Sequence, residues 1–359
     1  MIFFDNGLVN FDNSEEDPIH EYSGSDRKEP RLVDGVPFMV KYSDKRARIG
    51  ELDTSYVNNT LSEYIGSHLA AIVGLPAHKT YLGIFHEELV VGCENFLNDY
   101  EVSHEFSFYM RKKYDSSEIG RLPKYEQIND VIKSDSFLKG IQEDALQRYW
   151  DTFVFDAWIA NFDRHKGNWA YIYNRIDKST RPAPVYGCGS TLYPALSEIG
   201  MQKVMSSEYE IRRRIHVFPN AALLLNGAKV GYYEMMASGF DNYCTASVKR
   251  IVPRIDMIEA ERIINNTPAI SNVRKQFYIR MLRERKERIL DRAYKAVISG
   301  NFDLAARDRI LNKKPFTDLM LIEEMKREGK QIVKVDCGDV EENIDNTSKR
   351  KALKRGKGL

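Results

Sequence analysis

The chain has 359 residues, of which 43% are hydrophobic, so it can bury a substantial core in one bilobal domain or two ordinary domains, which excludes a largely disordered protein. Its 53 Lys and Arg residues nearly balance its 52 Asp and Glu residues, and a formal charge of +1 excludes the global basic field expected of a nucleic-acid-binding protein. The four cysteines form no C-x-x-C pair, which argues against a zinc site or a disulfide framework and fits a reducing cytoplasm.

The segment "MIFFDNGLVNFDNSEEDP" at the start has no basic n-region and soon becomes acidic. No apolar run in the sequence approaches the roughly 20 residues that a membrane helix needs. We therefore expect a protein that carries no classical export signal and does not enter a membrane.

Residues 1–99 are rich in strand and turn patterns. The stretch "GVPFMVKYS" (35–43) predicts one strand, and "YLGIFHEELVVGCENF" (81–96) predicts two strands joined at an acidic turn. Between them, apolar residues recur at helical spacing over residues 58–75, and Gly74 follows the pattern as a stop signal. The sequence therefore predicts a small sheet with one helix packed on it.

The next part of the chain is mostly helical. Apolar residues recur at i, i+3, i+4 and i+7 from Leu146 to Trp158, which predicts a buried helix leading into a polar loop. Beyond that loop, "WAYIYN" (169–174) and "APVYGC" (183–188) flank the turn-forming "NRIDKSTRP" and predict a β-hairpin.

Helical patterns return at residues 245–298, where "RMLRERKERILDRAYKAV" (280–297) is expected to form an exposed face. We divide the chain after residue 99 into a helical part (100–300), an extension (301–335) and a basic tail (336–359). The tail has six cations between Lys349 and Lys357 and is expected to be disordered.

The polar loop "NFDRHKGNW" (161–169) carries the residues that phosphoryl transfer requires. Such a reaction needs a carboxylate to orient and accept the proton of an attacking hydroxyl, and oxygen ligands that hold Mg²⁺. Asp163 and Asn168 have the same separation as the catalytic Asp and the metal-binding Asn of the protein-kinase loop. His165 lies between them and is grouped with Asp163 as a catalytic candidate, although the histidine of that loop precedes the Asp.

A solvated turn would account for the same string. Asn161 and Asp163 could cap backbone amides, as these residue types often do in turns. His165 could equally be a structural hydrogen-bonding residue, because no second histidine stands at metal-ligand spacing. The neighbouring motifs have to decide between the two interpretations.

Lys41 ends the strand "PFMVKY", the position that a phosphate-pairing lysine occupies in kinases. By itself a lysine at a strand end is more often a solvated terminus. Glu63 could pair with Lys41, as a helix glutamate does in kinases, or close a capping box with Thr60. We favour the cap.

Two further stretches fit a nucleotide site. The turn "YSGSDRK" could direct backbone N–H groups at phosphates, and its candidate residues are Ser23, Gly24, Ser25 and Lys28. In "VVGCENF", backbone groups from Glu94 to Phe96 could bind an adenine edge while the Phe96 ring packs nearby. Taken singly, these are an ordinary loop and a strand end with a core phenylalanine.

Taken together and in this order, the motifs resemble the HipA-like family of serine/threonine protein kinases, in its compact form. The resemblance covers roughly residues 20–300, and "NFDRHKGNW", "VYGCGSTLYP", "CENF" and "NTLSEYIGSHLA" carry it. It implies an α+β fold with two lobes: a small β-rich N-lobe (1–99), a larger helical C-lobe (100–300), and ATP with Mg²⁺ between them.

The resemblance also implies roles for single residues. Lys41 would contact the phosphates, while Glu94 and Phe96 would hold adenine. Asp163 would be the catalytic base and Asn168 a metal ligand. The turn that holds Ser23, Gly24, Ser25 and Lys28 would cover the phosphates, and Ser23 and Ser25 would be candidates for autophosphorylation.

Gly187 is where the chain departs from the family. The family pattern has an aspartate in "VYDCGS" that binds Mg²⁺, whereas this chain reads "VYGCGS". Glycine offers no side-chain oxygen, and losing a metal ligand should cost at least the 10- to 100-fold that changes around metal sites commonly cost. We therefore expect an impaired or inactive kinase, either a deliberately disarmed enzyme or a natural pseudokinase.

Two other functions stay open. "DRHKGN" also resembles the catalytic loop of phosphatidylinositol kinases, which would make the chain a lipid or small-molecule kinase. A non-catalytic nucleotide-binding or interaction module is the other. The HipA-like resemblance implies the toxin of a bacterial toxin–antitoxin system, which would be a cytoplasmic protein with a protein substrate such as a translation factor. It equally allows delivery to a host as an effector, with a host protein as substrate, and it allows an antitoxin partner.

Overall fold

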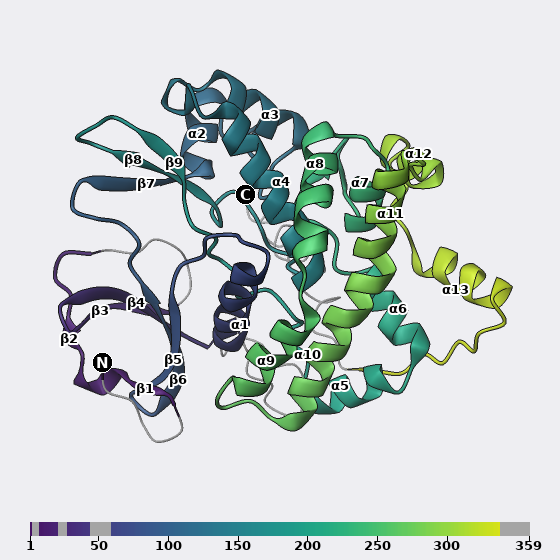
Figure 1. Ribbon diagram of the computed structural model, residues 1–359, viewed down its shortest axis with the longest axis horizontal. Helices are drawn as coiled ribbons and strands as arrows, with labels where there is room; N and C mark the ends of the chain where they lie inside the picture. Colours follow the sequence, from purple (N-terminus) through teal and green to yellow (C-terminus); the bar gives the residue numbers. More distant parts are fainter. Residues whose placement is uncertain (2–6, 21–26, 44–58, 338–359) are drawn as a thin grey trace, which may run out of the picture.

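A computed structural model describes residues 1, 7–20, 27–43 and 59–337 of the chain. Figure 1 shows a β-sheet of N-terminal residues on one side and a larger group of helices on the other, with the helix α1 (Asn59–Ile72) between them. This arrangement confirms the predicted α+β fold with a small β-rich lobe and a larger, mainly helical lobe. We call these parts the N-lobe and the C-lobe.

The N-lobe sheet has six strands in the order β1-β5-β6-β4-β3-β2. The strands are β1 (Val9–Asn10), β2 (Glu15–Glu16), β3 (Lys28–Val33), β4 (Val36–Tyr42), β5 (Thr80–Phe85) and β6 (Glu88–Glu94). The strands predicted in 35–43 and 81–96 are thereby confirmed. The turn between β5 and β6 consists of His86 and Glu87, both at positive φ (49° and 63°), as a two-residue hairpin turn of primed type requires.

Strand alternation in β4 explains how α1 is placed. Met39 belongs to the apolar cluster that includes Leu61 of α1, and Lys41, two residues further, lies on the same face. The intervening side chains point to the opposite face of the sheet. That face packs a second core of Val9, Phe11, Phe38, Val40, Tyr42, Phe85 and Val90.

A second, three-stranded sheet joins β7 (Glu101–Glu105), β8 (Ala170–Asn174) and β9 (Thr180–Pro182). The predicted hairpin is correct in its first strand and wrong in its second, because β9 lies within the expected turn. Residues 183–188 are irregular and reach the N-lobe side, where Val185 forms an isolated bridge with Ala77. Pro182 and Pro184 explain this, since proline cannot donate to a strand ladder.

The C-lobe is built around α4 (Gln142–Ile159), which confirms the predicted buried helix: Trp150 and Trp158 on it are fully buried. The other helices are α2 (Phe106–Lys113), α3 (Tyr125–Ser134), α5 (Glu198–Met205), α6 (Glu208–His216), α7 (Tyr232–Ala237), α8 (Asn242–Ile251), α9 (Met257–Asn266), α10 (Asn272–Arg285) and α11 (Asp291–Ser299). The short strands β10 (Leu224–Leu225) and β11 (Ala228–Lys229) form a separate pair. The 301–335 extension contains α12 (Leu304–Leu311) and α13 (Asp318–Arg327).

The expectation that 280–297 forms an exposed face is wrong. A π-helical turn (Lys286–Leu290) interrupts the stretch, and Arg285 just before it is 0% exposed. The Arg285 Nε donates to the carbonyl of Ala157 (2.6 Å) and its Nη1 to that of Arg214 (3.0 Å), at the C-terminal ends of α4 and α6. A cation is favoured there because helix C-termini carry partial negative charge and unsatisfied carbonyls.

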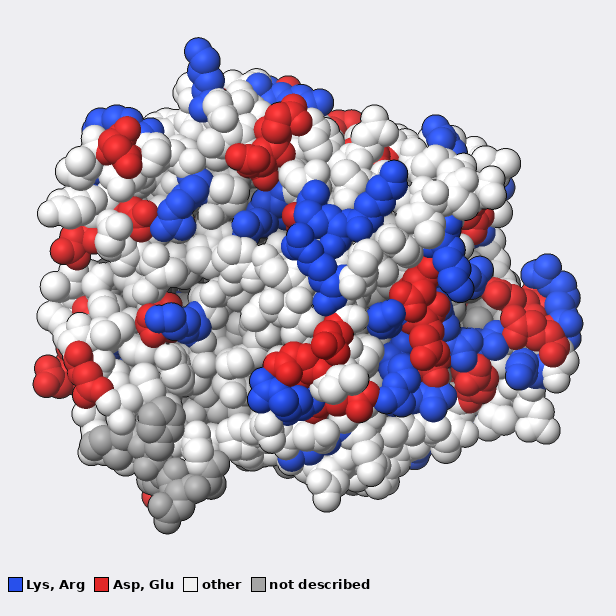
Figure 2. Space-filling model, viewed as in Figure 1, with Lys and Arg blue, Asp and Glu red and all other residues white. Residues whose placement is uncertain are grey.

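Within the described ranges, no helix is long and apolar enough to cross a membrane. All four cysteines are buried and free of disulfides. The face drawn in Figure 2 intermingles basic and acidic side chains and shows no field of one sign, in keeping with the balanced composition. The predicted disordered tail from Gly338 onward lies outside the described residues.

Candidate active site

Lys41 at the end of β4 meets Glu63 of α1. Its Nζ lies 3.5 Å from Glu63 Oε2, with side-chain exposures of 19% and 4%. The capping-box role that we favoured for Glu63 is therefore wrong, because its carboxylate points into the interior toward the sheet. The strand-end lysine and the helix glutamate form the pair that is typical of a kinase N-lobe.

Glu63 also connects the N-lobe to the segment that contains Gly187. Its Oε1 accepts the backbone N–H of Cys188 at 3.0 Å and lies 3.1 Å from Nε2 of the buried His78. Burial alone would raise the pKa of Glu63, but the Lys41 ammonium, His78 and the Cys188 N–H together hold it well below its ordinary value. No sequence pattern points to His78, which lies between α1 and β5.

These contacts of Glu63 make the stability of the fold depend on pH in the acidic range. Because the pKa of Glu63 in the folded chain lies below the ordinary value of 4.5, the carboxylate stabilises the fold fully above that pH and progressively less as the pH falls. We expect Glu63→Gln to lower the urea midpoint at pH 7 and to flatten its decline below pH 4.5. The control Glu287→Gln removes an exposed carboxylate and should leave the dependence of the urea midpoint on pH as it is in the unmodified protein, the parent. If both variants show the same pH dependence, Glu63 is not the group responsible.

Two lysines of the N-lobe sheet are neighbours. Lys28 at the start of β3 is directly opposite Lys41 in the antiparallel register of β3 and β4, so both side chains leave the same face of the sheet. Two like charges so placed are unfavourable unless an anion lies near them. The predicted phosphate-binding residues Ser23, Gly24 and Ser25, including both autophosphorylation candidates, lie outside the described residues.

The predicted hinge follows β6. Phe96 packs against Ala170, Ile172 and Ala183, and its ring is stacked on Tyr186 with centroids 6.2 Å apart. This cluster joins the end of the N-lobe sheet to the segment just before Gly187. The Glu94 side chain points outward to Lys79, and its N–H donates to the Lys79 carbonyl, so this N–H is already used within the protein.

The catalytic-loop candidates lie together after α4. Asn168 Nδ2 donates to the Asp163 carbonyl at 2.7 Å, which closes the loop across their five-residue interval. The Gly167 N–H donates to His165 Nδ1 at 3.0 Å, and His165 Nε2 lies 3.9 Å from Asp163 Oδ2. In the neutral ring the proton therefore lies on the nitrogen facing Asp163. That nitrogen is therefore a donor on the side of His165 that faces the Asp163 carboxylate.

Gly187 lies beside Asn168. Its φ is +70°, and a Cβ added there would lie 2.7 Å from Asn168 Cγ and 2.9 Å from its Oδ1. The Asn168 amide thus covers the position from which an aspartate side chain would extend. The left-handed backbone suits glycine, and among other residues it suits Asp and Asn best.

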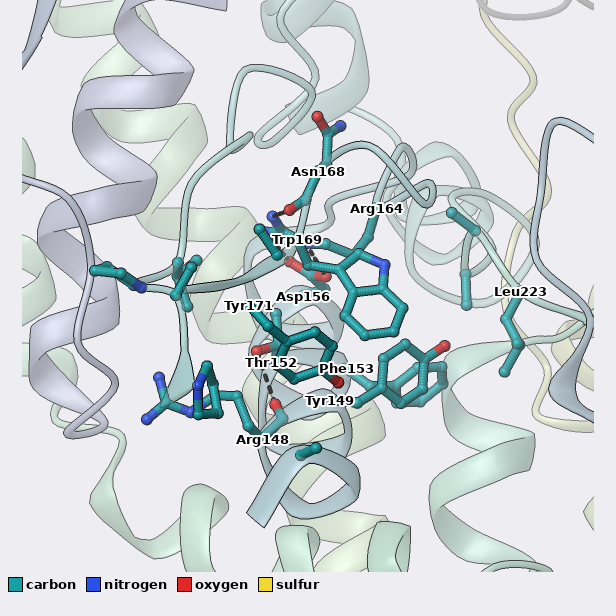
Figure 3. Close-up of a pocket in the computed structure, with 18 of the residues that line it drawn as sticks. Arg148, Tyr149, Thr152, Phe153, Asp156, Arg164, Asn168, Trp169, Tyr171 and Leu223 are labelled. Carbon is teal, nitrogen blue, oxygen red and sulfur yellow. Dashed lines mark hydrogen bonds and ion pairs between the residues drawn. The ribbon is translucent and has the colours of Figure 1, made fainter. Parts of the chain in front are cut away.

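Two important residues escaped prediction from the sequence: Asp156 on α4 and Arg164 in the loop. Arg164 donates from Nε and Nη2 to both oxygens of Asp156 at 2.8 Å and from Nη1 to the Asn168 carbonyl at 2.9 Å (Figure 3). Its Nη1 also donates to the Tyr186 carbonyl. Burial would lower the pKa of Arg164, but the Asp156 charge keeps it above its ordinary value. The sequence signal for this pair was Asp156, a carboxylate within the apolar face of a predicted helix.

A cavity of about 40 Å³ lies against the catalytic loop, and its lining includes the aromatic side chains of Tyr149, Trp169 and Tyr171, which Figure 3 labels. Its lining includes Asn168 of the catalytic loop and Ala170 and Ala183, on which Phe96 packs, but neither Lys41 nor Glu63. Its volume corresponds to no more than a few water molecules.

The donor set fits a nucleotide better than it fits a metal ion. Lys28 and Lys41 provide positive charge for phosphates. For Mg²⁺, which prefers oxygen ligands, the loop offers the Asn168 amide and the Asp163 carboxylate, while Gly187 offers nothing. Nowhere in the described ranges do three or more His, Cys, Asp or Glu side chains gather as metal ligands. The loop and Gly187 together therefore offer one carboxylate at this position, that of Asp163.

This chain is similar to known proteins in sequence and in structure. No family model matches the chain. It is 35% identical to the serine/threonine-protein kinase CtkA of Helicobacter pylori over 263 residues, which cover 73% of this chain and 79% of CtkA. The crystal structure of that proinflammatory kinase superposes with a TM-score of 0.76 at 30% identity, covering 82% of this chain and 99% of the other.

A more distant likeness concerns the fold alone. HipA of Shewanella oneidensis, in its complex with HipB and operator DNA, matches with a TM-score of 0.50 at 14% identity. The match covers 79% of this chain and 70% of HipA.

Proposed function

Because this chain belongs to the serine/threonine protein kinases of HipA-like fold, we propose that it binds ATP between the N-lobe sheet and the catalytic loop. It transfers the γ-phosphoryl group to a serine or threonine of another protein, at a rate reduced by Gly187. Asp163 orients the acceptor hydroxyl and takes its proton as the new P–O bond forms and the bond to the leaving ADP breaks. Lys41 holds the phosphates.

One observation carries this proposal: the predicted residues from both lobes form a continuous series of contacts. Lys41 pairs with Glu63, Glu63 accepts the Cys188 N–H, and Gly187 next to it lies against Asn168. Asn168 in turn donates to Asp163. These contacts link Lys41 to the backbone of the loop that carries the Asp163 carboxylate, which supports the proposal, because phosphoryl transfer requires both groups in one site.

The cofactor roles follow from the same residues. Mg²⁺, when bound, would neutralise charge on the phosphates, with Asn168 and Asp163 as its protein ligands. Glu94 and Phe96 would flank the adenine through backbone groups and ring packing. Ser23, Gly24, Ser25 and Lys28 would cover the phosphates, with Ser23 and Ser25 as autophosphorylation candidates.

Lys41→Met is the first test. Removing a charge-assisted contact worth about 1.5–3 kcal/mol should weaken ATP affinity by about 10- to 100-fold and leave adenosine affinity unchanged. Calorimetric titration with both ligands measures this. The parent should gain about 2.7 kcal/mol of stability at ATP concentrations near 100 times the dissociation constant.

Asp163→Ala is the matched control, because it should keep the affinity for ATP measured without Mg²⁺ while phosphoryl transfer falls by about 100- to 10,000-fold. A parent whose melting temperature responds to neither ATP nor a non-hydrolysable analogue would favour the non-catalytic interaction module.

The acceptor is a protein in this proposal, since the similarity to CtkA favours that class over a lipid. Parallel assays with a generic protein acceptor and with phosphoinositide vesicles separate the two. A bacterial cytoplasmic translation factor and a host protein reached by an effector are the candidate substrates, and an antitoxin is a candidate partner. Phosphoproteomics of cells expressing the parent and the Gly187→Asp form would identify the substrate.

A further inference from the structure

The loop between α2 and α3 lies over the catalytic loop. Lys166 Nζ donates to the carbonyl of Gly120 and, at 3.3 Å, to that of Arg121. On its other side, Gln127 of α3 donates to the Glu118 carbonyl at 3.2 Å. The segment 115–121 is therefore attached both to α3 and to the loop that carries Asp163.

Arg121 extends from this segment to the catalytic carboxylate. Its Nη2 donates to Asp163 Oδ1 at 3.1 Å, with side-chain exposures of 67% and 22%. An ion pair this exposed contributes little to folding, typically about 0–1 kcal/mol. A contribution to folding stability therefore does not explain why Arg121 pairs with Asp163.

We infer that Arg121 is a positioning residue for phosphoryl transfer, which holds the Asp163 carboxylate in the orientation that receives the acceptor hydroxyl. This inference rests on the proposed function. The second oxygen of Asp163 faces His165 Nε2 at 3.9 Å, beyond hydrogen-bond distance. A carboxylate can accept about four hydrogen bonds, so the acceptor hydroxyl can bind while Arg121 stays in place. Segment 115–121 would then lie beside the bound acceptor hydroxyl, because Arg121 contacts the carboxylate that receives it.

The test measures transfer from ATP to dephosphorylated casein, a generic protein acceptor, by Arg121→Ala, Arg121→Lys, Asp163→Ala and Arg181→Ala. The four variants are made in the parent and in the Gly187→Asp form. Arg181 is the matched control, because it is half-exposed and pairs with Glu101 at 2.9 Å on the three-stranded sheet.

We expect Arg121→Ala to lower kcat about 10- to 100-fold, the effect of a misplaced catalytic group, with KM for ATP and the ATP-induced melting shift unchanged. Arg121→Lys should recover part of the loss. A purely structural role would instead lower the melting temperature and leave the lysine variant no better than the alanine one.

Equal rates for Arg121→Ala and Arg181→Ala, beside an inactive Asp163→Ala, would overturn the inference and leave the proposed function intact. If neither the parent nor the Gly187→Asp form transfers phosphate, the proposed function is wrong and the inference is wrong with it.

Discussion

Gly187→Asp is expected to raise the rate of phosphoryl transfer by at least about 10- to 100-fold, because under the proposed function it adds a carboxylate ligand for Mg²⁺ beside Asn168. The backbone at Gly187 is already left-handed, at φ +70°, which aspartate adopts more readily than most residues. What must change is the Asn168 side chain, whose Cγ would lie 2.7 Å from the new Cβ.

The contact between residue 187 and Asn168 leads to a second expected result, a dependence of the activity on Mg²⁺ concentration. Asn168 has to rotate away from residue 187, which releases its hydrogen bond to the Asp163 carbonyl. Rotation also frees the amide oxygen for a metal ion. Restored activity should therefore rise with Mg²⁺ concentration over a range in which the parent's activity does not.

Gly187→Ala separates the carboxylate from the crowding. It introduces the same Cβ against Asn168 and the same backbone strain, without an oxygen ligand. We expect it to be no more active than the parent and somewhat less stable. If the aspartate and alanine forms are equally inactive while both bind ATP, the assignment of the metal site to residues 168 and 187 is wrong.

Local patterns predicted much of this site. Asp163 and Asn168 are close because they lie five positions apart in one loop, and the position of Lys41 was predictable because it lies near the end of a strand. Such features depend on neighbours in sequence. The fold of the N-lobe was predictable for the same reason, since alternation in β4 and helical spacing in α1 are both local.

Other features depend on contacts between distant segments. Glu63 fits a capping box in the sequence, but burial and the contacts with Lys41 and Cys188 determine where its side chain lies. The sequence pattern predicts Arg285 on an exposed helical face. Its guanidinium instead donates to backbone carbonyls at the C-terminal ends of α4 and α6, which are distant in sequence. Periodicity predicts which face of a helix is buried, whereas a buried charge depends on its partner.

Arg164→Met is expected to destabilise the protein by about 3–5 kcal/mol, because it leaves the Asp156 carboxylate buried without its cation. Asp156 is 1% exposed and Arg164 6% exposed, so solvent cannot replace the lost partner. The same substitution releases the Asn168 and Tyr186 carbonyls, which Arg164 now joins. Urea unfolding followed by circular dichroism measures the loss.

The double variant Asp156→Asn with Arg164→Met distinguishes an unpaired buried charge from lost packing. It removes more of the native interaction than Arg164→Met does, yet it should be more stable, because the asparagine carries no charge and its amide oxygen can still accept from Asn161, as Asp156 does at 3.0 Å. The surface variant Arg181→Ala should cost no more than about 1 kcal/mol. Additive losses in the double variant would mean that Arg164 acts mainly by joining the two carbonyls.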